Sequence, residues 1–265
     1  MFTDFFKMSS LPFTERITTI KMIRDARMEQ GLARLQNLLY QGSIALIYGV
    51  TGVGKSTLIK LFLATIEQNQ YFPLYIHFTN LKKATSIFNL IVTGLGEAPK
   101  HTKDRLFMQI NDKIKKLNLT TLLVFDDAHL LSADAITDLR LLVSSPMDDA
   151  PRIKIILSAQ ESIKTTLKNG LLTDFAQRIS IDYHIHPLTK TETSSYIDLQ
   201  MKNAGTSEKI FHEEAKEMIY EYSAGIARQI NNIAIASLIN ASIQKTQIIT
   251  SDTVTQSISE LQLRV

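Results

Sequence analysis

The stretch "GVTGVGKST", residues 49–57, decides the fold of this chain. It matches the phosphate-loop pattern G-x-x-x-x-G-K-[ST]. Glycines let the backbone turn sharply and aim its N–H groups at phosphate oxygens, and the N-terminus of a following helix adds favourable charge. The required context is present, because an apolar run of strand length (43–49) precedes the loop and a helical pattern (56–68) follows it.

The loop therefore predicts a site for the phosphates of a nucleotide. We expect Lys55 to reach the β- and γ-phosphates and Ser56 to hold Mg²⁺, which makes ATP and Mg²⁺ the predicted cofactors. The residues of the loop predicted to bind the nucleotide are Gly49, Val50, Thr51, Gly52, Val53, Gly54, Lys55, Ser56 and Thr57.

A pair of acids, Asp126 and Asp127, ends the apolar run 120–127 about 70 residues after the loop. In phosphate-loop enzymes an aspartate at a strand end helps to hold Mg²⁺, usually through water. A neighbouring acid can orient the attacking water. We therefore predict Asp126 as the Mg²⁺ residue and Asp127 as the catalytic base. The alternative is that two acids close a strand in a solvated turn.

Further apolar runs, 72–78, 152–160 and 178–185, alternate with helical patterns at 84–96, 104–118 and 132–145. This alternation predicts an α/β fold with a parallel five-stranded sheet. After Pro187 the pattern is helical only, at 189–205, 212–225, 227–244 and 251–262. We therefore predict a nucleotide-binding domain over 1–186 and a helical domain over 187–265.

Composition limits the class of protein. The chain has no cysteine, which excludes disulfides and thiolate metal sites. The start lacks the pattern of a signal peptide, and no apolar run approaches the ~18 residues of a membrane span. We expect a cytoplasmic protein without a membrane partner. A net charge of +3 permits contact with nucleic acid without indicating it.

The order of motifs resembles an AAA+ ATPase, in which a P-loop αβα sandwich precedes a small helical lid. The nucleotide of such a protein is expected in the cleft between the two. Within that superfamily, "FTDFFKMSSLPF" (2–13) and "VFDDAHLL" (124–131) are similar to the ExeA-like and TnsC/MuB/IstB-like group. That group comprises secretion-linked ATPases and transposition regulators.

The resemblance implies roles for further residues. "IKIILSAQ" (153–160) is similar to the sensor 1 strand, so Ser158 or Gln160 would sense the γ-phosphate. "DFAQRIS" (174–180) resembles the arginine-finger segment, so Arg178 would reach a neighbouring subunit's γ-phosphate. "SAGIARQIN" (223–231) resembles sensor 2, with Arg228 directed at the nucleotide. The alternatives are an ordinary polar strand end and two surface arginines.

Three details of the resemblance are less direct. "LPF" (11–13) resembles a linker that packs on adenine, although Phe13 could equally fill the core. Asp127 stands where the family usually has glutamate, and a carboxylate misplaced by roughly 1 Å can cost on the order of 100-fold in rate. We therefore predict slow hydrolysis. His129 could contact the pocket or face solvent or core.

Basic residues are concentrated between positions 81 and 120, where eight lysines and arginines stand against three acids, an excess of +5. Lys82, Lys83 and Lys103 are the candidates for contact with the backbone of double-stranded DNA. The alternative is a solvated helix face.

The resemblance and this charge together predict an ATP-dependent regulator of DNA transposition. It would form a homo-oligomer on DNA, as a ring or filament, and recruit a transposase. One alternative is an ExeA-like secretion-assembly ATPase, whose family normally adds a membrane span and a wall-binding segment beyond the 265 residues here. Others are a replication-initiator-like loader, normally with a winged-helix domain, and a small-molecule kinase, which would carry an acceptor-binding lid inside its α/β domain.

Overall fold

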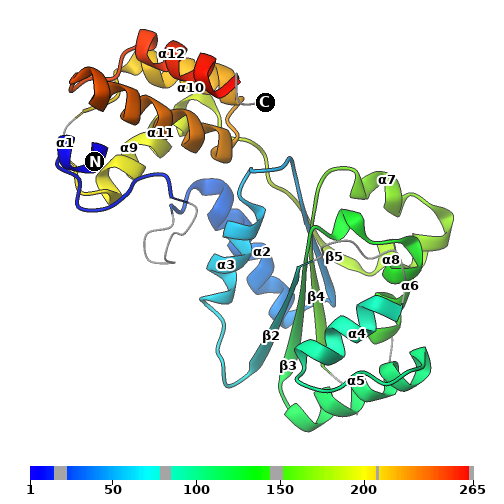
Figure 1. Ribbon diagram of the computed structural model, residues 1–265. Coiled ribbons are helices and arrows are strands. Elements are labelled where there is room, and N and C mark those ends of the chain that lie inside the picture. Colours follow the sequence, from blue (N-terminus) through cyan, green and yellow to red (C-terminus); the bar gives the residue numbers. More distant parts are fainter. Residues whose placement is uncertain (15–22, 78–84, 144–151, 207–208, 263–265) are drawn as a thin grey trace. The chain divides into compact units, whose positions relative to one another are not determined.

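The structure is a computed structural model that describes residues 1–14, 23–77, 85–143, 152–206 and 209–262 (Figure 1). The chain divides into two compact units. One, here the sheet unit, comprises Met28–Gly49 and Lys55–Ile185. The other, the helical unit, comprises Met1–Arg27, Val50–Gly54 and His186–Val265.

A five-stranded sheet forms the centre of the sheet unit. Its strands lie in the order β2-β3-β4-β1-β5, and every neighbouring pair is parallel. Parallel strands covered on both faces are nearly continuous apolar runs, as "IALIY" of β1 illustrates. The strands are β1 Ile44–Tyr48, β2 Tyr71–His77, β3 Thr120–Asp126, β4 Ile153–Ala159 and β5 Ile179–His184. The predicted parallel sheet is confirmed.

Helices cover both faces of this sheet, which makes three layers (Figure 1). On one face lie α2 (Ala26–Tyr40) and α3 (Lys55–Leu63), and on the other α4 (Thr85–Gly94), α5 (Lys103–Leu117) and α6 (Ala133–Leu142). Shorter elements are η2 (Ala128–Leu130), α7 (Ile163–Leu167), η3 (Gly170–Leu172) and α8 (Thr173–Gln177).

The core of the sheet unit joins one face of the sheet to α4, α5 and α6. Its fully buried members include Leu46, Phe125, Leu157, Phe88 and Leu139. Burying a side chain of this size contributes about 1.5–3 kcal/mol. This packing fixes the ends of the strands, where the polar residues of the predicted site stand.

The helical unit packs around a second core. Its helices are α1 (Phe2–Phe5), α9 (Lys190–Asn203), α10 (Glu213–Ser223), α11 (Ala227–Gln244) and α12 (Ser251–Gln262). Side chains from the N-terminal segment, Phe6 and Phe13, join Ile219, Ile230 and Leu238 in this core. The predicted division placed residues 1–186 together, whereas by their contacts Met1–Arg27 cluster with the helical unit.

Two elements differ from the pattern-based expectation. α2 was not predicted, although its apolar residues Met28, Leu32, Leu35 and Leu38 follow helical spacing and are buried. α3 ends at Leu63 instead of near 68, because the Thr65 hydroxyl and N–H both donate to the Phe62 carbonyl and close the last turn. No helix in the described part of the chain is long and apolar enough to cross a membrane.

Candidate nucleotide site

The Asp126 carboxylate lies at the end of β3 and accepts four hydrogen bonds. Its Oδ1 accepts from the Ser158 hydroxyl at 2.7 Å and from the Asp127 backbone N–H at 3.1 Å. Its Oδ2 accepts from the Ser56 hydroxyl at 2.9 Å and from the Tyr75 hydroxyl. These donors come from β4, α3 and β2, which meet Asp126 at the edge of the sheet where β2, β3 and β4 end.

This set of donors keeps Asp126 charged. Burial raises the pKa of the Asp126 carboxyl, but the hydrogen bonds from Tyr75, Ser158, Ser56 and the Asp127 N–H outweigh burial and hold the pKa below its usual value. Burial and the adjacent Asp126 carboxylate raise the pKa of the Tyr75 hydroxyl. At neutral pH Asp126 is therefore an ionised acceptor and Tyr75 a protonated donor.

The lysine of the phosphate loop is buried at the first turn of α3. The Lys55 Nζ donates to the Gly49 carbonyl at 2.9 Å, and the Gly49 N–H donates to the carbonyl of Ala159, the last residue of β4. The ammonium group is thus held on the carbonyl at the start of the loop. Exchange of that carbonyl for a phosphate oxygen would give the lysine its predicted role.

The tip of the loop belongs to the helical unit. Gly52 adopts a φ of +83°, which L residues rarely adopt, and its carbonyl accepts the Arg228 N–H at 3.1 Å. A Cβ on Gly52 would lie 2.8 Å from the Arg228 Cβ and 3.2 Å from the Ile226 Cγ2. Arg228 stands in the first turn of α11 with an exposed side chain. Its role toward a nucleotide stays a prediction.

Two histidines flank the carboxylate of Asp127. The His77 Nδ1 lies 4.0 Å from Oδ2, and the His129 Nδ1 lies 3.9 Å from Oδ1. The His129 Nδ1 is buried and has no hydrogen-bond partner among the described residues. Asp127 itself has a φ of +55°, a conformation that aspartate tolerates better than most residues. Sequence reasoning weighed His129 but missed His77, which pairs in register with Asp126 only once β2 is placed beside β3.

The two sensor candidates on β4 differ in position. Ser158 is 0% exposed and its hydroxyl is used by Asp126. Gln160 follows β4 and is half-buried. Ser158 therefore fixes Asp126 in this structure, and the role of γ-phosphate sensor stays a prediction for Ser158 and for Gln160.

Two further predicted residues lie in contrasting places. Arg178 is exposed at the end of α8, directly before β5. Its role as an arginine finger stays a prediction. The Phe13 side chain is only 1% exposed and packs edge-on against Phe211 in the core of the helical unit, with ring centroids 6.3 Å apart. Of the two alternatives for Phe13, the structure places it in the core.

Lys103, one of the three DNA candidates, has an ion-pair partner within the sheet unit. Its ammonium forms an ion pair with Asp138 of α6, a carboxylate that is 2% exposed. Because this buried acid needs a counter-charge, Lys103 has a structural partner, and its contact with DNA stays a prediction. Lys82 and Lys83, the other two DNA candidates, lie outside the described residues.

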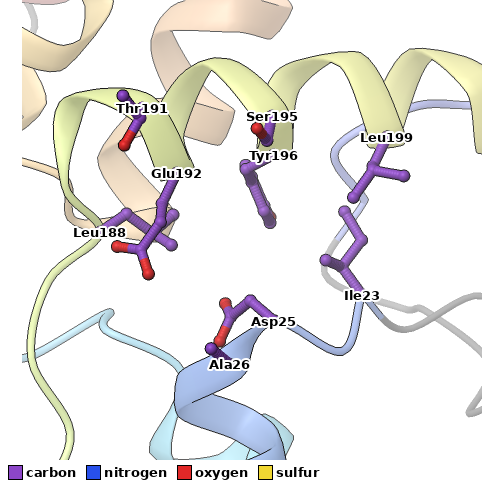
Figure 2. A pocket seen from close by; sticks show the side chains of 9 residues that line it. All are labelled: Ile23, Asp25, Ala26, Leu188, Thr191, Glu192, Ser195, Tyr196 and Leu199. Carbon is purple, nitrogen blue, oxygen red and sulfur yellow. The ribbon is translucent and has the colours of Figure 1, made fainter.

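A cavity of about 210 Å³ lies in the helical unit (Figure 2). One wall comes from α9 and the opposite wall from residues 23–26, with Asp25 fixed by an ion pair with Arg27 at 2.6 Å. The Leu188 N–H donates to the Gly225 carbonyl at 2.9 Å, one residue before the segment that meets Gly52. The lining residues are Ile23, Asp25, Ala26, Leu188, Thr191, Glu192, Ser195, Tyr196 and Leu199.

Ser56 and Asp126 fit a magnesium ion. Their hydroxyl and carboxylate oxygens lie 2.9 Å apart, and Mg²⁺ prefers oxygen ligands. The described residues hold no group of three or more His, Cys, Asp or Glu side chains that could bind a metal alone. A metal here would take its other ligands from phosphates and water, as is usual for Mg²⁺.

Comparison with known proteins supports this architecture. Residues 37–167 match the family model described as AAA domain. General secretion pathway protein A of Aeromonas hydrophila is 27% identical over 250 residues, which cover 91% of this chain and 45% of that protein. The chain therefore spans less than half the length of that relative.

Solved structures agree at the level of the fold. Cdc6p from Pyrobaculum aerophilum superimposes with a TM-score of 0.74 at 22% identity, covering 94% of this chain and 70% of that one. The Aeropyrum pernix ORC1 protein, solved in complex with DNA, gives 0.69 at 14% identity, covering 90% and 66%. The predicted fold is confirmed: a parallel P-loop sheet with flanking helices and a C-terminal helical region, as in AAA+ ATPases.

Proposed function

We propose that this chain binds ATP with Mg²⁺ through residues 49–57 and hydrolyses it. One observation carries the proposal: the ionised Asp126 carboxylate accepts a hydrogen bond from the hydroxyl of Ser56, the residue directly after the buried Lys55. A carboxylate, a hydroxyl and an ammonium group in this order are the parts that a phosphate-loop ATPase needs.

Each residue then has a defined task. Lys55 moves its ammonium from the Gly49 carbonyl to the β- and γ-phosphates, and Ser56 and Asp126 hold Mg²⁺ directly and through water. Bound Mg²⁺ neutralises charge on the phosphates. Asp127 orients the attacking water, and Gln160 senses the γ-phosphate.

The cavity in the helical unit suits the adenine base. Ile23, Leu188 and Leu199 offer apolar surface for the faces of the ring. The carboxylates of Asp25 and Glu192 can accept hydrogen bonds from the exocyclic amino group of adenine, whereas guanine presents an oxygen at that position. The cavity belongs to the same unit as residues 50–54 of the loop.

Assembly into a homo-oligomer completes the proposal. The exposed Arg178 is available to a neighbouring subunit, where an arginine would neutralise charge that develops during phosphoryl transfer. ATP would then favour assembly, and hydrolysis would reset it.

Two cellular roles fit this ATPase. We place an assembly ATPase of the secretion type first, because the relative from the general secretion pathway aligns with 91% of the chain. The second role is a regulator of DNA transposition that binds double-stranded DNA and recruits a transposase. The basic excess of residues 81–120 favours it, and one structural neighbour was solved with DNA.

The ATPase proposal is tested by nucleotide binding and phosphate release. Lys55→Ala should weaken ATP binding at least ten-fold and abolish hydrolysis. The matched control is Lys60→Ala, which removes an exposed lysine of the same helix and should leave both unchanged. The proposal would be refuted if the Lys55→Ala variant bound ATP as tightly as the wild type.

A second measurement separates the two roles. Binding to random-sequence double-stranded DNA is measured with and without ATP over a range of salt. ATP-dependent affinity that falls steeply with salt supports the DNA regulator. Absence of DNA binding even at low salt, with ATPase activity intact, favours the secretion role.

A further inference from the structure

Asp126 has no acceptor capacity left in this structure. A carboxylate offers about four lone-pair sites, and the two hydroxyls and one N–H described above, together with Tyr75, fill all four. A magnesium-bound water that is to donate to Asp126 must therefore displace one of these four donors.

The donors differ in how easily they leave. On Oδ1, Ser158 is fully buried and the Asp127 N–H is backbone, so both are fixed. On Oδ2, Ser56 can keep its proton on Asp126 while its lone pair binds the metal. Tyr75 is 40% exposed on the edge strand β2, and its ring can turn toward solvent. Tyr75 is the donor that can yield.

We infer that the Tyr75 hydroxyl occupies the position on Asp126 that a magnesium-bound water uses, and that Tyr75 competes with the metal for this carboxylate. Tyr75 thus raises the concentration of Mg²⁺ that the site requires. In the metal-free protein it also satisfies a buried charge that would otherwise lack one of its partners. This inference rests on the proposed ATP site, and it assigns Tyr75 a role that neither loop nor acid pair predicts.

The experiment measures binding of a non-hydrolysable ATP analogue by calorimetry at increasing free Mg²⁺. Tyr75→Phe keeps the ring and removes only the hydroxyl. It should lower the half-saturating Mg²⁺ concentration about ten-fold, equivalent to about 1.4 kcal/mol. That value is near the lower end for a hydrogen bond to a charged acceptor. Binding of the analogue in EDTA should stay as in the wild type.

Tyr71→Phe is the matched control, because Tyr71 lies four residues earlier on the same strand. It should leave the Mg²⁺ requirement unchanged. Tyr75→Leu also removes the hydroxyl and should lower the half-saturating Mg²⁺ concentration in the same way, so that the result does not depend on one variant. Thermal unfolding of each variant verifies that it is folded.

The outcomes separate the inference from the function on which it rests. A wild type that binds the analogue with Mg²⁺, and a Tyr75→Phe variant whose Mg²⁺ requirement is unchanged or higher, overturn the inference alone. A wild type without Mg²⁺-dependent binding overturns the ATP site and the inference together. A lower requirement in both Tyr75 variants, and not in Tyr71→Phe, supports the inference.

Discussion

Replacement of Ser158 by alanine tests the electrostatics of the site. The variant removes a hydrogen bond of 2.7 Å between a fully buried hydroxyl and the charged Asp126 carboxylate. Hydrogen bonds to charged groups contribute about 1.5–3 kcal/mol. We therefore expect the free energy of unfolding at neutral pH to fall by about 2 kcal/mol. For a protein of this size, roughly 2–4 °C of Tm per kcal/mol gives a decrease of about 4–8 °C.

The loss should depend on pH in a defined direction. Because the pKa of Asp126 is lowered in the folded state, its ionised form contributes stability above the usual pKa of an aspartate, and this stability is lost as pH falls through the folded pKa. Ser158 is one cause of the lowering. The difference between wild type and Ser158→Ala should thus be full at pH 7 and shrink as pH falls through the folded-state pKa values of Asp126 in the two proteins, of which the wild-type value lies below the usual value of an aspartate.

Urea unfolding without nucleotide, at pH 7 and at about pH 2.5, which lies well below the usual pKa of an aspartate, measures both effects. Ser237→Ala is the control: this serine is equally buried, but its hydroxyl donates to the neutral Ile233 carbonyl at 2.8 Å. It should cost about 1 kcal/mol at both pH values. A Ser158→Ala loss below about 0.5 kcal/mol, or one equal at both pH values, would refute the electrostatic reasoning.

Three further predictions concern the ion pair, the loop and the base. Lys103→Ala leaves the Asp138 carboxylate buried without its counter-charge and should cost about 2–3 kcal/mol, below the usual range for buried pairs because Lys103 is half-exposed. The double variant Lys103→Ala/Asp138→Ala should lose less stability than the sum of the losses of the two single variants. Losses that simply add would show that the two side chains do not interact. Gly52→Ala should destabilise more than Gly96→Ala, since both have φ near +80° but only Gly52 has close neighbours. Equal unfolding midpoints for the two variants would show that Arg228 can move away from a Cβ at position 52 without cost. Asp127→Glu should raise the steady-state ATPase rate, by up to roughly 100-fold, because the longer side chain reaches the attacking water. A faster wild type would reject the interpretation of Asp127.

The sheet and the phosphate loop could be predicted because both depend on local pattern. Strands such as β1 are short apolar runs bounded by polar residues, and the loop needs fixed spacing between Gly49 and Lys55. Asp126 was predictable for the same reason, since it ends an apolar run after the loop. α2 was predictable on the same ground, because its buried apolar residues follow helical spacing.

The contacts of the site depend on tertiary structure and were not predictable. Tyr75 meets Asp126 only because β2 pairs with β3 in one register, and a shift of one residue would turn its side chain to the other face. Lys103 and Asp138 lie 35 positions apart and meet because α5 packs near α6. Phe13 belongs to the motif "LPF" (11–13), which suggested a contact with the adenine base, yet it lies in a core against Phe211, far along the chain.

The four bonds to Asp126 also decide what an amide would do in its place. The Oδ1 side includes a backbone N–H, which cannot accept a hydrogen bond, whereas both partners of Oδ2 are hydroxyls, which can reverse theirs. An asparagine at 126 would therefore adopt one orientation, with its NH₂ toward Ser56 and Tyr75. Asp126→Asn is therefore more than a removal of charge. It would make acceptors of the Ser56 and Tyr75 hydroxyls, and it would put an NH₂ group where the proposed metal-bound water needs an acceptor.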